Sequence, residues 1–140
     1  MKYTAGQKGF TLLEIIIVIV IIGILASLAL ARMRSTIQFS HSAEALQQIG
    51  VIRNSIERCY LMTRTYASCS SFDLIDTDDP SDLPNTHFTY ALPGTFSTSN
   101  YAILATRNTR DGGNSGDWVR LDSAAGVVSR SGSGAFSSIQ

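Results

Sequence analysis

Two cysteines offer the clearest chemistry in this chain of 140 residues. Cys59 and Cys69 stand ten positions apart, and an even pair of cysteines in a short exported chain is typical of a disulfide. The alternatives are two unrelated thiols or half of a metal site. Because the sequence has no C-x-x-C and only two histidines, His41 and His87, a zinc site has poor support. We therefore predict a Cys59–Cys69 disulfide if the chain is exported.

A glycine-rich stretch, DGGNSGD, holds the second set of candidate ligands. Asp111, Asn114 and Asp117 supply oxygen donors, and calcium is bound by oxygen ligands in tightly curved loops. The glycines are also typical of a hairpin loop that binds no metal, and we favour that interpretation. We thus predict no cofactor, with calcium at these three residues as the alternative. The upstream stretch DTDDPSDLP lacks the spacing of an EF-hand loop and is expected to be a solvated loop.

Sequence signals of catalysis and of nucleic-acid binding are missing. The chain has no G-x-S-x-G motif, no phosphate-binding loop and no pair of catalytic carboxylates, and neither histidine lies in a supporting motif. Lys and Arg number 11 and so do Asp and Glu, so the composition shows no basic footprint. We predict that the chain is not an enzyme and that the subunit alone binds no nucleic acid.

The N-terminal region poses a different question, because Glu14 stands at the start of a long apolar run. From Ile15 to Ala31 there are 17 residues without a charge, the lower limit for a helix that crosses a bilayer. A secretory signal would use Ala29-Leu30-Ala31 as its cleavage site and leave Arg32 as the new terminus. An ordinary anchor would explain the length of the run. Neither explains Glu14, because an acidic side chain in a membrane segment is costly and usually functional.

The segment Lys8–Glu14, KGFTLLE, with the apolar run behind it, resembles the class III signal of type IV pilins and type II secretion pseudopilins. The resemblance implies a short basic leader, residues 1–9, which a prepilin peptidase removes by cutting after Gly9. The peptidase then methylates the new amino terminus on Phe10. The family's glutamate lies four residues beyond that terminus, which is the position of Glu14.

Cleavage after Gly9 would give Glu14 a physical role. The new amine on Phe10 lies one helical turn from Glu14, on nearly the same face of the helix. When subunits pack side by side in a filament, the Glu14 carboxylate of one subunit can pair with the Phe10 amine of a neighbour. Such a pair neutralises two charges that are each expensive in a low-dielectric bundle, and it specifies the register between subunits.

Periodicity indicates the elements that must position these residues. Apolar residues at spacings of three and four continue past Ala31, and no proline occurs before Pro80. We therefore predict one helix from Thr11 to about Leu61, roughly 75 Å long; an anchor followed by a separate helix is the alternative. Four short segments with turn-rich spacers predict an antiparallel meander, namely 87–92, 101–106, 118–122 and 126–131. The amphipathic half of the helix is expected to cover the apolar face of the sheet.

These elements predict an α+β fold, the lollipop-shaped pilin fold that the resemblance also implies. In chain order we expect a leader, an apolar transmembrane and assembly helix, the amphipathic half of the same helix, an acidic loop, and a sheet head with a C-terminal tail. Their bounds are 1–9, 10–31, 32–61, 62–87 and 88–140.

We predict a structural subunit that polymerises through its N-terminal helix into a type IV pilus or pilus-like filament, used for adhesion, motility or uptake. The expected partners are identical subunits in a helical filament, the prepilin peptidase and the pilus or secretion assembly machinery. The precursor is expected in the bacterial inner membrane, and the filament in the periplasm or outside the cell. A pseudopilin of a type II secretion system is the first alternative. An exported soluble or anchored binding module is the second, and Arg32 as first residue would identify its soluble form.

Overall fold

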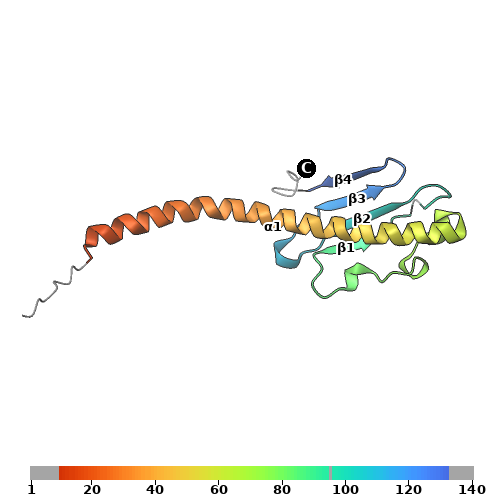
Figure 1. The fold of residues 1–140 in the computed structure, drawn as a ribbon, viewed down its shortest axis with the longest axis horizontal. Helices are drawn as coiled ribbons and strands as arrows, with labels where there is room; N and C mark the ends of the chain where they lie inside the picture. The colour runs from red at the N-terminus through yellow and green to blue at the C-terminus, as the bar shows by residue number, and fades with distance from the viewer. Residues whose placement is uncertain (1–9, 95, 133–140) are drawn as a thin grey trace, which may run out of the picture. The chain divides into compact units, whose positions relative to one another are not determined.

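The computed structural model describes residues 10–94 and 96–132 (Figure 1). The predicted leader, residues 1–9 with the cleavage residue Gly9, lies outside the described residues, as does the end of the predicted tail, residues 133–140. The chain forms two compact units that divide after Arg34.

One helix, α1 (Leu12–Thr63), accounts for most of the N-terminal half of the chain. The prediction of one helix through the apolar and amphipathic segments is therefore confirmed. The helix begins where the hydroxyl of Thr11 accepts a hydrogen bond from the backbone N–H of Glu14 at 3.3 Å, as an N-cap does. It ends where Arg64 takes a left-handed φ of 60° and its N–H donates to the Tyr60 carbonyl at 2.8 Å.

The apolar stretch of the first unit, Leu12–Leu30, is exposed along its whole circumference. Leu12–Leu30 is the one described segment that is long and apolar enough to cross a membrane, with a mean hydropathy of 3.0, and none of it is buried. An apolar helix of this kind has no polar face to turn to water. The segment therefore requires an apolar environment that the unit itself does not supply.

The second unit contains a four-stranded antiparallel sheet in the order β1-β2-β3-β4 (Figure 1). The strands are β1 (Phe88–Ala91), β2 (Ala102–Arg107), β3 (Trp118–Asp122) and β4 (Val127–Ser131). The register sets Tyr90 opposite Ala105 and Ala105 opposite Val119, so these buried side chains share one face of the sheet. The predicted meander and the α+β fold class are confirmed, with the strand ends within one residue of the expected positions.

A single buried cluster joins the second half of α1 to this sheet. Ala45, Ile49, Ile52 and Ile56 recur at intervals of four, three and four residues, and each is at most 3% exposed. Such intervals place them on one face of a helix. The sheet supplies the facing side chains of the cluster, namely Phe88, Tyr90, Ile103, Ala105, Val119 and Leu121. The expected cover of the sheet by the amphipathic half of the helix is therefore present.

The acidic segment between α1 and β1 folds into three short 3-10 helices. They are η1 (Tyr66–Cys69), η2 (Phe72–Leu74) and η3 (Pro80–Asp82). Asp79 caps η3, because its carboxylate accepts a hydrogen bond from the Ser81 N–H at 2.8 Å. Ile75 is 1% exposed and anchors the segment in the core. A fourth 3-10 helix, η4 (Arg110–Gly112), lies between β2 and β3.

Candidate functional sites

Phe10 and Glu14 lie at the exposed start of α1. Phe10 is 78% exposed, and the Glu14 backbone N–H is satisfied by the Thr11 carbonyl at 3.1 Å and by the Thr11 hydroxyl. Among the described residues, the Glu14 carboxylate has no hydrogen bond or ion pair. The structure thus leaves this carboxylate available for a group outside the chain, and the predicted pairing with a neighbour's Phe10 amine stays a prediction.

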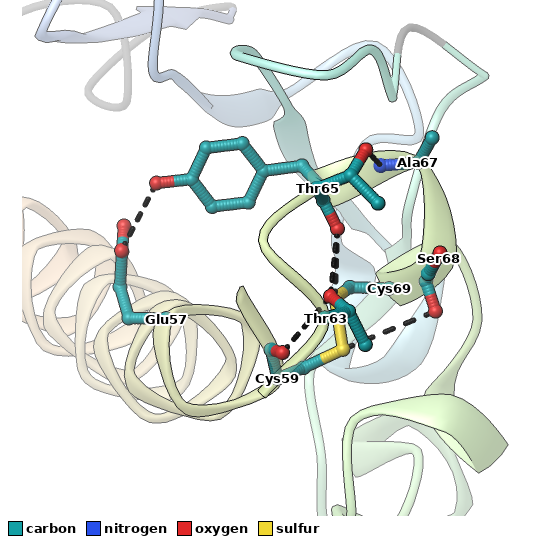
Figure 2. Close-up of a disulfide and its surroundings, with 8 residues drawn as sticks. Glu57, Cys59, Thr63, Thr65, Ala67, Ser68 and Cys69 are labelled. Atoms are coloured by element: carbon teal, nitrogen blue, oxygen red, sulfur yellow. Dashed lines mark hydrogen bonds between the residues drawn. A yellow bond between two sulfur atoms is a disulfide. The ribbon is translucent and has the colours of Figure 1, made fainter. Parts of the chain in front are cut away.

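The Cys59–Cys69 disulfide ties η1 to the last turns of α1 (Figure 2). The two Cα atoms lie 6.0 Å apart, and both cysteines are buried. Thr63 supports the same corner, since its Oγ1 lies 3.0 Å from the Cys59 carbonyl and 2.9 Å from the Thr65 carbonyl. Thr65 in turn caps η1 by accepting from the Ala67 N–H at 3.3 Å. The disulfide therefore closes the junction between helix and loop.

Glu57 is held by two tyrosines from different elements. The hydroxyl of Tyr66 donates to Glu57 Oε2 at 3.0 Å, and that of Tyr101 donates to Oε1 at 2.8 Å. Burial and the hydrogen bond to Glu57 raise the pKa of both tyrosines above the ordinary value. Both hydroxyls therefore stay protonated as donors, and the carboxylate links α1 to η1 and to the start of β2.

A second polar cluster joins α1 to the start of β1. Glu44 Oε2 lies 2.7 Å from His87 Nδ1 and 4.0 Å from His41 Nδ1, and the two imidazole rings have centroids 4.1 Å apart. The other nitrogen of His87, Nε2, lies 2.9 Å from a carboxylate oxygen of Asp111. The side chains of His41, Glu44 and His87 are 13%, 28% and 20% exposed, so the cluster is partly open to solvent.

The surroundings lower the pKa of both Glu44 and His41. Burial alone would raise the pKa of Glu44, but hydrogen bonds from the backbone and side chain of His87 outweigh it and lower that pKa below the ordinary value. Burial lowers the pKa of His41, and the nearby Arg107 charge adds to the effect. Arg107 is itself buried, with its guanidinium 5.5 Å from the centre of the Phe88 ring.

The three calcium candidates, Asp111, Asn114 and Asp117, lie between β2 and β3, where their side chains and backbone shape the connecting turns. Asp111 takes a left-handed φ of 52° and directs its carboxylate to His87. Asn114 Oδ1 accepts a hydrogen bond from the Gly116 N–H at 2.9 Å, and Asp117 is buried. These hydrogen bonds stabilise the turn without a metal ion, and calcium binding there stays the untested alternative.

Sequence reasoning did not find the cluster of His41, Glu44 and His87. Two histidines without a supporting motif gave a zinc site poor support, although His41 and Glu44 have the i,i+3 spacing that places side chains on one helix face. That spacing was the only local signal. His87 joins the cluster through the fold, 43 positions after Glu44.

Comparisons with known proteins agree with the N-terminal pattern. The family model of the prokaryotic N-terminal methylation motif matches residues 4–30. The type IV major fimbrial protein FimA of Dichelobacter nodosus is 37% identical over 76 residues, which cover 51% of this chain and 49% of that protein. The type II secretion system core protein G of Escherichia coli (strain K12) is 38% identical over 66 residues, covering 47% of this chain and 46% of that protein.

The fimbrial protein EcpC of Eikenella corrodens is 43% identical over 54 residues, or 39% of this chain and 35% of that protein. The chain therefore matches about half the length of its curated relatives or less, and no solved structure is a significant match. The methylation motif and these relatives confirm the predicted resemblance to type IV pilins and pseudopilins.

Proposed function

We propose that this protein is a structural subunit that polymerises through its N-terminal helix into a type IV pilus or a pilus-like filament. The observation that carries the proposal is the apolar segment Leu12–Leu30, none of which is buried and all of which lies within the matched methylation motif, residues 4–30. A monomer in water would expose all of this apolar surface, whereas a bilayer or a bundle of identical helices would bury it. The named relatives are fimbrial and secretion-system proteins, which supports a structural role over an enzymatic one.

Processing comes first in the proposed sequence of events. A prepilin peptidase cuts between Gly9 and Phe10, which removes the leader and its two lysines, and methylates the Phe10 amine. The precursor waits in the inner membrane with residues 10–31 in the bilayer, and it enters the filament when the assembly machinery extracts it. A helix in hydrocarbon satisfies its backbone groups internally, so this segment is suited to the waiting state.

Charge pairing then selects the register of assembly. The exposed Glu14 carboxylate of one subunit pairs with the Phe10 amine of a neighbour inside the helical bundle. A charge buried there without a partner would cost several kcal/mol, so slipped arrangements are disfavoured. The amphipathic half of the helix, residues 32–61, carries the loop 62–87 and the sheet head 88–140 on the outside of the filament.

A pseudopilus of a type II secretion system is the second candidate. The similarity to the type II secretion system core protein G supports it, and both candidates share the same N-terminal chemistry. A type IV pilus is favoured by the major fimbrial relatives, and adhesion, motility and uptake are the uses to be tested.

Mass spectrometry of the N-terminal peptide from filaments sheared off native cells tests the proposal. We expect a peptide that starts with N-methylated Phe10, in filaments long enough to pellet after shearing. Short filaments that stay within the envelope would favour the pseudopilus. A terminus at Arg32, or an intact Met1 found only in membranes, would overturn the proposal and favour the exported or anchored binding module.

A further inference from the structure

We propose that His41, Glu44 and His87 form a binding site for one divalent transition-metal ion, for which Zn²⁺ is the best fit. One ligand atom from each side chain lies within 4.8 Å of the other two. The inference is separate from the proposed filament function, because all three residues belong to the second unit. Two imidazoles and one carboxylate are a donor set that suits zinc and its neighbours in the transition series, while calcium prefers oxygen alone.

The distances fit an ion of this size with small side-chain adjustments. Zinc ligands lie about 2.0–2.2 Å from the metal, so two ligands of a tetrahedral ion are about 3.4 Å apart. His87 Nδ1 and Glu44 Oε2 are closer than this, at 2.7 Å, and His41 Nδ1 and Glu44 Oε2 are farther apart, at 4.0 Å. An ion between them would widen the first distance and shorten the second. The partial exposure of all three side chains leaves room for water as a fourth ligand.

Neighbouring polar groups hydrogen-bond to two of the three candidate ligands, His87 and Glu44, as the supporting groups of a metal site do. Asp111 lies 2.9 Å from His87 Nε2, so its carboxylate can accept a hydrogen bond from Nε2–H and leave the Nδ1 lone pair to face the ion. Glu44 Oε1 accepts from the His87 backbone N–H at 2.9 Å and lies 3.3 Å from the Thr86 hydroxyl. These bonds hold one carboxylate oxygen and present the other, Oε2, to the two histidines.

The local charge balance also accommodates a cation. The buried Arg107 guanidinium opposes a positive ion, but it interacts with three carboxylates, those of Glu44, Asp111 and Asp117. Three carboxylates around one guanidinium leave negative charge in excess next to the cluster. Zn²⁺ would bind Glu44 Oε2 and the lone pair on His87 Nδ1, and the imidazole would keep its one proton on Nε2, where it faces Asp111. The bound ion would link helix α1 to the start of β1.

Zn²⁺ titration of the full chain in detergent, in competition with a chromogenic chelator, tests the site. We expect one Zn²⁺ per chain, with affinity at least about tenfold lower in His41→Ala and in His87→Ala. Asp111→Asn removes only a supporting carboxylate and is expected to cost about 10–100-fold. Asp78→Asn, an exposed carboxylate in the acidic loop, is the matched control and is expected to leave the affinity unchanged.

Co²⁺ gives an independent readout of the ligands. Bound Co²⁺ is expected to show visible d–d absorption in the wild type, and this absorption should disappear in His87→Ala. Circular dichroism in the presence of chelator establishes that each variant is folded; if His87→Ala is not, His41→Ala and Asp111→Asn decide. The site is refuted if the wild type retains no stoichiometric Zn²⁺, if the histidine variants bind it equally well, or if only Asp78→Asn weakens binding.

Discussion

The two halves of helix α1 differ in whether their apolar side chains are buried within the chain. Along Leu12–Leu30 every side chain is exposed and none contributes to a core. Farther along the same helix, Ile49, Ile52 and Ile56 are at most 3% exposed against the sheet. Equally apolar isoleucines are therefore exposed in one half and buried in the other. The head therefore buries its apolar side chains within its own core, whereas the first half of α1 requires lipid or other subunits to bury its side chains.

The glutamates of the helix repeat this contrast. Glu44 and Glu57 each bridge α1 to other elements through hydrogen bonds within the chain. Glu14 has no such partner for its carboxylate among the described residues. Because a carboxylate in an apolar setting requires compensation, we expect Glu14 to pair with the Phe10 amine of a neighbouring subunit once the segment is buried.

Removing the charge of Glu14 is expected to have the largest effect. Glu14→Ala should leave a neighbour's Phe10 amine unpaired inside the filament, at a cost of about 3–5 kcal/mol per subunit contact. We expect processing after Gly9 and membrane insertion to continue while the yield of sheared filaments collapses. Glu14→Gln, which keeps the size and removes the charge, should behave in the same way. Normal filament yield from either variant would show that charge pairing does not drive assembly.

The same substitution at one buried and one exposed isoleucine tests the difference between the two halves of α1. Ile52→Ala should lower the free energy of unfolding of the head by about 2–5 kcal/mol, because it opens a cavity in the core. Ile19→Ala, at a residue 60% exposed in the first half, should change that free energy by less than about 0.5 kcal/mol. Chemical denaturation in detergent, followed by the fluorescence of Trp118 in β3, measures both. Equal effects at the two positions would contradict the division of the helix.

Removing the disulfide should have a smaller effect, confined to the head. The bond closes a short loop between Cys59 and Cys69, so the double variant Cys59→Ala/Cys69→Ala should lose about 2–3 kcal/mol of stability. Membrane insertion of Leu12–Leu30 should not change. The Trp118 denaturation curve measures the loss, and reduced wild-type protein provides the control. If the head of the variant is as stable as that of the oxidised wild type, the bond does not stabilise the junction of helix and loop.

Local patterns were sufficient to predict helix α1 and the four strands, but not the short 3-10 helices η1 to η4. The helix was predictable because apolar spacing continues without proline up to Thr63, and the strands because short alternating runs stand between turn residues. The Cys59–Cys69 disulfide was predictable from the even number of cysteines and the expected export of the chain. The tyrosine bonds to Glu57 were not predicted, since Tyr101 lies 44 positions from Glu57 and no sequence period connects them.

Features that depend only on contiguous residues could be inferred from the sequence alone. The predicted cleavage after Gly9 and the apolar run behind Glu14 could be inferred together, because a peptidase signal and a membrane helix are each contiguous in the sequence. Only the tertiary structure decided which polar groups meet. His87 reaches Glu44 and Asp111 because β1 packs against α1 and the turn after β2 returns to the same edge. Such meetings depend on the packing of distant elements, which local spacing does not encode.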